Sequence, residues 1–205
     1  SIRFIWYSRH SVQLGKTTHC FSSTPTHPEI RILLIGDSTL YGTGCTDAKN
    51  SIAGRIHQDY PLASITNESE NGMTLRRLLK KIAVIDLSAY DLILIQVGGM
   101  DVLKLTPLFF VRNMLTELGT MLTRTFSGTV MCISVNNTGV PPLMHAPFTH
   151  FFDRRSRMFS ELWHTWSKEH SFIHVPLYRS RDTDPLYALR TTHFAIDRMH
   201  PNDNG

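Results

Sequence analysis

Cysteine, long apolar runs and dense blocks of basic residues are all scarce in this sequence, and each absence excludes a class of protein. Only Cys20, Cys45 and Cys132 occur among 205 residues, without a CxxC pair, so we expect no disulfide framework. The sequence has no run of about 18 apolar residues, the length that would predict a membrane span. The 21 Lys and Arg exceed the 17 Asp and Glu by four, a formal charge of +4, but they are dispersed, so nucleic acid is not an expected partner.

The composition is that of a folded domain. Hydrophobic residues make up 41% and charged residues 19%, which is enough apolar material for a core and too little charge for a disordered chain. The length fits one domain with a short appendage. Residues 1–29 show no clear hydrophobic period, so we expect an N-terminal extension there and a regular domain over residues 30–205.

Two motifs in the extension resemble parts of a phosphate-binding loop and of a metal site, and both are incomplete. Gly15-Lys16-Thr17-Thr18 resembles the end of a phosphate-binding loop, but the first glycine of that loop and the preceding strand are missing. His19, Cys20 and His27 have no matching second pair of ligands, so we expect no metal site.

From residue 30 onward, short apolar runs alternate with stretches of helical period. Because parallel strands need crossover connections, this alternation predicts a parallel sheet with helices on both faces. We expect strands at 31–35, 62–66, 91–97, 129–135 and 172–177, and helices after Ser51 and over 74–85, 106–122 and 150–169. The aromatic stripe of the last helix is interpreted as core.

Residues that can carry chemistry follow several of the expected strands. The first strand ends in Gly36-Asp37-Ser38, and the last leads to Asp197-Arg198-Met199-His200. A serine on a strand-to-helix turn can act as a nucleophile, with a histidine as its base and a carboxylate to orient that histidine. Each motif alone is typical of a turn or a helix cap. Together at one edge of a sheet they indicate a catalytic set.

With these motifs, residues 30–205 resemble the SGNH hydrolases, also called the GDSL esterase/lipase family. Gly36-Asp37-Ser38 is similar to the nucleophile block, and Asn71-Gly72 falls where the family has an oxyanion-hole glycine. Gly98-Gly99-Met100-Asp101 matches the Gly-x-Asn-Asp block except for Met100. The resemblance implies a three-layer α/β/α fold with a mostly parallel five-stranded sheet, the flavodoxin-like SGNH hydrolase fold.

The resemblance also implies an activity, that of a serine esterase or lipase-type hydrolase. Ser38 would attack the ester carbonyl, His200 would serve as general base and then general acid, and Asp197 would orient His200. The backbone amides of Ser38 and Gly72 would bind the oxyanion. Met100 stands where the family has its third donor, and a thioether donates no hydrogen bond, so we expect a weakened hydrolase. No metal or organic cofactor is implied.

Several alternatives stay open at this stage. Asn136 or Asn137 could supply the missing donor, although turn residues are the preferred interpretation. We expect the loop over residues 136–148 to line the site. The substrate is expected to be a small-molecule acyl ester or an acetylated sugar. An acyltransferase on the same site, or a non-catalytic binding protein that retains the fold, are the alternative functions.

The two ends of the chain give two further expectations. Family members continue into a terminal helix beyond the point that corresponds to Gly205, so we expect that helix to be truncated here. The chain starts at Ser1 rather than Met, which is compatible with a removed leader or anchor. Membrane association is expected only through such a leader. A periplasmic, secreted or membrane-tethered protein is slightly favoured over a cytoplasmic one.

Overall fold

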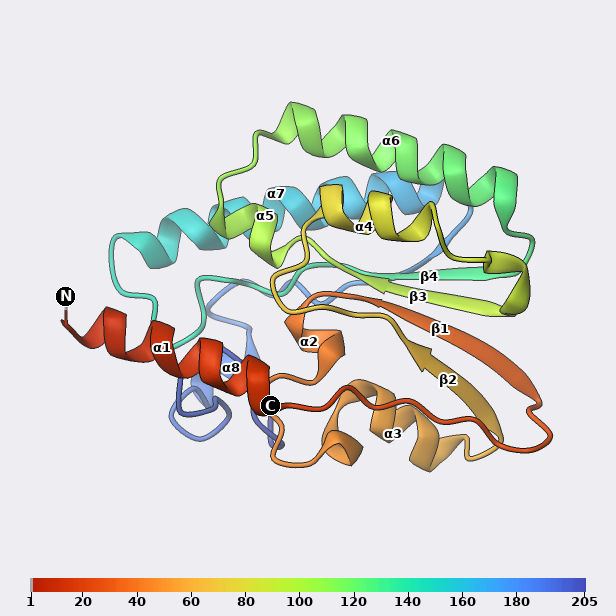
Figure 1. Cartoon of the computed structure of the whole chain (residues 1–205). Helices are drawn as coiled ribbons and strands as arrows, with labels where there is room; N and C mark the ends of the chain where they lie inside the picture. The colour runs from red at the N-terminus through yellow and green to blue at the C-terminus, as the bar shows by residue number, and fades with distance from the viewer. Residues whose placement is uncertain (1) are drawn as a thin grey trace.

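A sheet of five parallel strands forms the centre of the computed structural model, which describes residues 2–205 (Figure 1). The strand order is β2-β1-β3-β4-β5, and all four pairings are parallel. The predicted α/β fold with a five-stranded parallel sheet is therefore confirmed. The strands are β1 (Ile30–Gly36), β2 (Ala63–Asn67), β3 (Leu92–Gln96), β4 (Thr129–Ile133) and β5 (Ile173–Val175).

Helices fill the connections and cover the sheet on both sides. In Figure 1, α4, α6 and α7 lie above the sheet and α3 lies below it. No described helix combines the length and the apolarity that crossing a membrane requires. The helices are α1 (Ile2–Thr17), α2 (Ser38–Tyr41), α3 (Ile52–Asp59), α4 (Leu75–Ile82), α5 (Gly99–Leu103), α6 (Leu108–Thr125), α7 (Phe148–Glu169) and α8 (Pro185–Ala188), with 3-10 turns at Ala48–Asn50 and Leu87–Ala89.

The two faces of the sheet bury different amounts of side chain. Leu33 and Ile35 of β1 point into the larger cluster, where they meet the apolar sides of α4, α6 and α7. Ile32 and Leu34 point the other way, into a smaller cluster with α2 and α3. Trp163 of α7 is fully buried in the larger cluster. Phe159, Trp163 and Trp166 of the aromatic stripe are thus core, as the sequence predicted, whereas Phe151 near the start of α7 is exposed.

The strand order places a crevice at the ends of β1 and β3. The chain leaves β1 for β2 at one side of the sheet and then returns to β3 on the other side of β1. The loops that follow β1 and β3 therefore diverge toward opposite faces. Ligands of such sheets bind where these loops separate, at the carboxyl ends of the strands.

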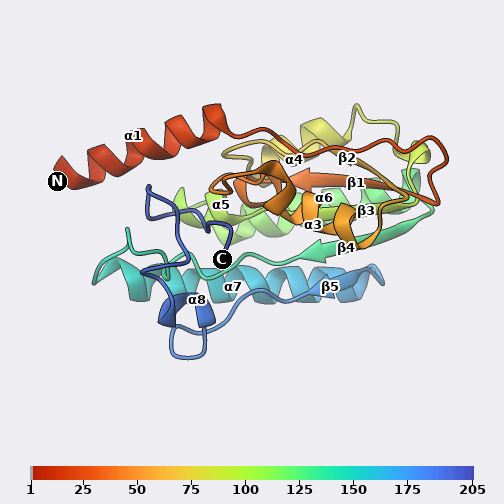
Figure 2. The ribbon, with the colours of Figure 1, turned by 90° about the horizontal axis from the view of Figure 1, so that it is seen from below.

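The extension forms more regular structure than its sequence pattern indicated. Residues 2–17 form α1, although their apolar residues follow no clear helical period. Ser23 then pairs with Ile65 of β2 through two antiparallel backbone hydrogen bonds of 2.9 and 2.7 Å. Figure 2 shows α1 lying above the C-terminal loop, on the side where the strands end.

One helix start differs from the sequence expectation. The helix expected over 106–122 begins later, because Pro107 is its cap and α6 starts at Leu108. The Thr106 hydroxyl donates to the Asp101 carboxylate at 3.0 Å.

Candidate active site

The nucleophile candidate Ser38 is the first residue of a one-turn helix that follows β1 directly. Asp37 caps this helix, because its carboxylate accepts a hydrogen bond from the Thr39 amide at 3.1 Å. Leu40 is fully buried and anchors the turn, and Gly42 ends it in the left-handed conformation. Ser38 is consequently held at the carboxyl edge of the sheet, where it is half-buried.

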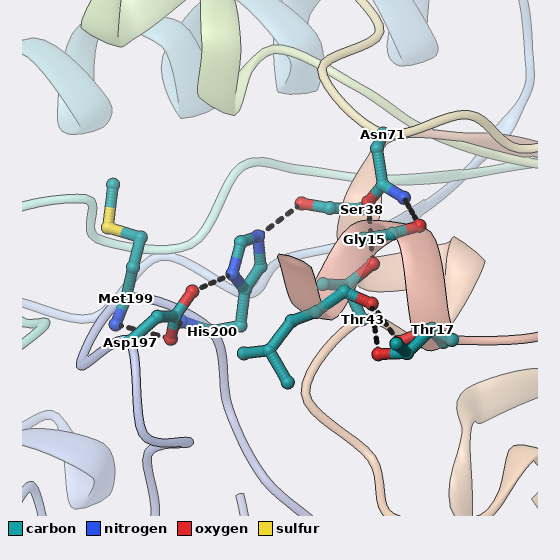
Figure 3. A network of polar contacts seen from close by, with 10 residues as sticks. Gly15, Thr17, Ser38, Thr43, Asn71, Asp197, Met199 and His200 are labelled. Carbon is teal, nitrogen blue, oxygen red and sulfur yellow. Dashed lines mark hydrogen bonds and ion pairs between the residues drawn. The ribbon is translucent and has the colours of Figure 1, made fainter. Parts of the chain in front are cut away.

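The structure brings Ser38, His200 and Asp197 together in one chain of hydrogen bonds (Figure 3). Nε2 of His200 lies 2.9 Å from the Ser38 hydroxyl oxygen, and Nδ1 lies 2.6 Å from the Asp197 carboxylate. With a proton on Nδ1, the ring donates to Asp197 and its Nε2 can accept the hydroxyl proton. The geometry is that of a nucleophile, a base and an orienting carboxylate.

The C-terminal segment reaches Ser38 because close packing and polar bonds fix it beside the loop after α2. A Cβ on Gly44 would lie only 2.1 Å from the Pro201 carbonyl oxygen, so only glycine permits this approach. The Asp203 carboxylate accepts from the Thr46 amide at 2.8 Å, and Arg55 donates to the Asp203 carbonyl at 2.8 Å. These contacts join residues that lie more than 140 positions apart in the sequence.

Asp197 is fully buried and is held in its ionised form. Burial by itself raises the pKa of this carboxyl, but the hydrogen bond and charge of His200 and the amides of Met199 and His200 outweigh burial, so the net pKa is lowered. The two amides donate to one carboxylate oxygen at 3.0 and 3.1 Å, and the imidazole takes the other oxygen. Both oxygens of the Asp197 carboxylate therefore bind groups of the turn over residues 197–200.

Gly72 lies in the loop after β2, at a φ of 74° that favours glycine. Its neighbour Asn71 fixes this loop through its side chain, which accepts from the Thr43 hydroxyl and donates to the Gly15 carbonyl at 3.2 Å. Figure 3 shows Asn71 beside Ser38 in this network. The loop that carries Gly72 is thereby tied both to the segment after α2 and to α1.

Met100 and the two asparagines after β4 were the candidates for the third oxyanion position. Met100 lies in the first turn of α5, just after β3, and is half-buried. Asn137 is buried, and its amide is already used in hydrogen bonds to Asp153 and to the Arg179 carbonyl, so it does not serve as an oxyanion donor. Asn136 lines a cavity of about 550 Å³ together with Thr39 and Pro201. The Asn137 side-chain oxygen also accepts from the Gly139 amide at 3.0 Å, which agrees with the preferred interpretation of Asn137 as a turn residue.

Sequence reasoning singled out the tripeptide around Asp37 without assigning this residue a task. Asp37 is buried beside the backbone amides of Thr39 and Gly99, and the Thr39 amide donates to its carboxylate at 3.1 Å. It therefore links the turn of Ser38 to the turn that precedes Met100. Burial raises the pKa of Asp37 to about 6, against the opposing effects of these amides and of His200. The signal in the sequence was its place as a cap residue just before a helix.

Within the described part of the chain, no three His, Cys, Asp or Glu side chains are grouped so that they could hold a metal ion. The cysteines Cys20, Cys45 and Cys132 are unpaired thiols. Burial raises the pKa of Cys20 to about 11 and that of Cys132 to about 12, so neither is a reactive thiolate near neutral pH. Ser38 is the nucleophile candidate that has a base beside it.

Comparison with protein families agrees with this geometry. The GDSL-like Lipase/Acylhydrolase family matches residues 34–205, a range that contains Ser38, Gly72, Asp197 and His200. No protein of curated function matches the chain in sequence.

Solved structures with the same fold include esterases. The psychrotrophic esterase EstA from Pseudoalteromonas sp. shares 16% identity at a TM-score of 0.65, with 85% of this chain and 89% of that chain covered. The lipase/acylhydrolase from Enterococcus faecalis shares 18% identity at a TM-score of 0.61, covering 84% and 87%. An acetylxylan esterase from Geobacillus stearothermophilus, solved as a catalytic mutant, shares 17% at 0.57, covering 87% and 89%. At these identities the likeness shows the fold.

The raised pKa of Asp37 predicts a pH-dependent cost in stability. The folded protein holds the Asp37 proton up to about pH 6, whereas the unfolded chain releases it near 3.8, so this residue makes folding less favourable as pH rises between those values. The free energy of unfolding of the wild type, relative to Asp37→Asn, should fall by about 2 kcal/mol between about pH 4.5 and pH 7. Urea unfolding of both proteins across this range measures the difference. A constant difference would show that Asp37 does not titrate there.

Proposed function

The chain belongs to the GDSL-like lipase/acylhydrolase family, and we propose that it hydrolyses a carboxylic ester through an acyl-enzyme on Ser38. The observation that carries this proposal is the continuous chain of hydrogen bonds from Asp197 through His200 to Ser38. Esterases among the solved structures of the same fold add support for the reaction class. Small-molecule esters, including acetylated sugars, are the proposed substrates.

The first half of the reaction forms the acyl-enzyme. The Ser38 oxygen attacks the ester carbonyl carbon while its proton passes to Nε2 of His200. The imidazolium that results is stabilised by the Asp197 carboxylate at 2.6 Å. His200 then gives this proton to the alcohol oxygen as the carbon–oxygen bond breaks, and the alcohol leaves.

The second half repeats the steps with water. A water molecule attacks the acyl carbon, His200 accepts its proton, and the bond to Ser38 breaks as that proton returns to the serine oxygen. The acid product leaves, and the starting state is restored. Every proton in the cycle passes through Nε2 of His200.

The negative charge that develops on the carbonyl oxygen needs hydrogen-bond donors. We assign this role to the backbone amides of Ser38, at the start of α2, and of Gly72, whose loop Asn71 holds in place. Met100 contributes no donor, because a thioether has no hydrogen to donate. The proposed enzyme therefore works with a two-amide hole and a lowered kcat.

A fluorophosphonate should label Ser38 alone, because the imidazole beside its hydroxyl is oriented by the Asp197 carboxylate. The Ser23 hydroxyl also lies 3.2 Å from an imidazole, that of His57, but this ring has no carboxylate partner among the described residues. Mass spectrometry of the tryptic peptides identifies the labelled residue, and Ser38→Ala should abolish the label. Ser69 makes a suitable control, since it is a buried serine whose hydroxyl has no partner in the described residues, and Ser69→Ala should label normally. Labelling that persists in Ser38→Ala would place the nucleophile elsewhere.

Restoring an amide at position 100 should raise the rate of hydrolysis. Met100→Asn introduces a donor that is shorter than the methionine, so it fits without overpacking. The new bond forms mainly with the oxyanion, so the gain should appear in kcat, by about 10- to 1,000-fold. Steady-state kinetics with 4-nitrophenyl acetate measures this change.

The matched control for Met100→Asn is Met100→Leu, which fills similar volume and donates nothing. Its kcat should stay close to that of the wild type. An equal rise in both variants would mean that the shape of the side chain, rather than a donated hydrogen bond, limits the reaction. No rise in Met100→Asn would mean that position 100 does not face the oxyanion.

A further inference from the structure

A groove runs between α1 and the C-terminal segment, and no step of the proposed reaction uses it. Two adjoining cavities of about 340 and 300 Å³ make up this groove, and Ile196 lines both of them. The first is lined by Trp6 and Tyr7 of α1 and by Phe194, and the second by Leu14 and Thr17. One wall of the groove is therefore a helix that precedes the family domain.

The groove leads toward the active site. The Gly15 carbonyl near one end of α1 binds Asn71, the neighbour of Gly72, and the Thr18 carbonyl accepts from Tyr41 of α2 at 3.3 Å. From Gly15 back to Trp6 the helix rises about 14 Å, at roughly 1.5 Å per residue. Figures 1 and 2 show α1 extending from the α2 region out past the C-terminal loop.

The far part of the groove meets the turn that carries His200. Arg198, two residues before His200, donates to the Tyr7 hydroxyl at 3.3 Å, and its guanidinium lies 5.6 Å from the Tyr7 ring centre. Arg190 lines the same cavity and stacks on Tyr187 at 4.7 Å. Two guanidinium groups and three aromatic rings, those of Trp6, Tyr7 and Phe194, thus border one space.

The charge of the groove has one sign. Neither residues 1–28 nor residues 185–196 contain an Asp or a Glu, so both walls are free of acidic residues. The acidic residues that border these ranges are Glu29, Asp184 and Asp197; Asp184 and Asp197 are buried, and Asp197 is bonded to His200. The larger cavity behind α2 differs, because Asp184 and Asp203 accompany Arg55 and Arg179 there. The groove beside α1 combines aromatic walls with two arginines, Arg190 and Arg198, that form no ion pair with the described residues.

We propose that this groove binds the alcohol portion of the ester, and that it selects an alcohol with an aromatic or apolar body and an anionic group. The assignment to the alcohol rests on the proposed function, in which His200 protonates the departing alcohol oxygen. The alcohol therefore lies on the side of His200, and Arg198 projects from the same turn. The rings pack against the body of the alcohol, and Arg190 and Arg198 pair with its carboxylate or phosphate.

A matched pair of esters tests this proposal. 4-Acetoxybenzoate and its methyl ester share the acetyl group and the aromatic alcohol, and they differ in the negative charge. The ratio of kcat/KM for the anion to kcat/KM for the methyl ester should fall about three- to tenfold in Arg190→Gln and in Arg198→Gln, the range for partly exposed ion pairs. The loss should come through KM, because an ion pair distant from the reacting atoms binds substrate and transition state alike.

The design separates the groove from the catalytic groups. Arg198→Gln lies between Asp197 and His200, so a disturbed catalytic turn would slow both esters and leave their ratio unchanged. Arg190→Gln is eight residues before Arg198 and provides an independent reading. The control Arg112→Gln removes an exposed arginine of α6, on the other side of the sheet, and should keep the wild-type ratio. Raising the salt concentration should lower the wild-type ratio and have little effect on that of Arg190→Gln.

Three results would overturn the proposal. An unchanged ratio in both groove variants, with Ser38 labelled by fluorophosphonate, would reject the groove and leave the esterase standing. A loss seen with 4-nitrophenyl hemiglutarate but not with 4-acetoxybenzoate would assign the groove to the acyl portion instead. Absence of both hydrolysis and labelling would reject the esterase and the groove together.

Discussion

A carboxylate buried away from water needs hydrogen-bond donors, and Asp197 finds three of them within its own turn. The amides of Met199 and His200 bind one oxygen, and the imidazole of His200 binds the other. This closed arrangement fixes both the orientation of the ring and the proton on Nδ1, so Nε2 is presented to Ser38. The rest of the site serves to bring Ser38 to that nitrogen.

The sheet supplies the other half of this constraint. Because β1 lies between β2 and β3, the turns after β1 and β3 separate at one edge and leave a crevice. The buried carboxylate of Asp37 lies between these two turns, because it accepts from the Thr39 amide at 3.1 Å and packs closely against Gly99. Buried contacts of Asp37, rather than a flexible loop, thereby set the distance between Ser38 and the turn that carries Met100.

Much of this arrangement was predictable, because local patterns determine it. Alternating apolar runs indicated the strands, and Ser51 marked the start of α3, where its hydroxyl accepts from the Gly54 amide. Ser38 stood at the end of β1, where a parallel sheet gathers its ligands, and the spacing of Asp197 and His200 indicated a shared turn, although that turn lies well beyond the end of β5. The contacts of α1 could not be foreseen, because they join Gly15 to Asn71 and Tyr7 to Arg198 across long stretches of sequence. No local period marks such pairs.

The central claim is that Ser38, His200 and Asp197 act as one unit that forms an acyl-enzyme. The most direct measurement is mass spectrometry of the protein after it is mixed with 4-nitrophenyl acetate and quenched in acid within the first turnover. We predict one acetyl group on the peptide that contains Ser38, with none in His200→Ala, whose serine has no base. Hydrolysis that proceeds at the wild-type rate in His200→Ala, or an acetyl group on any other residue, would contradict the account.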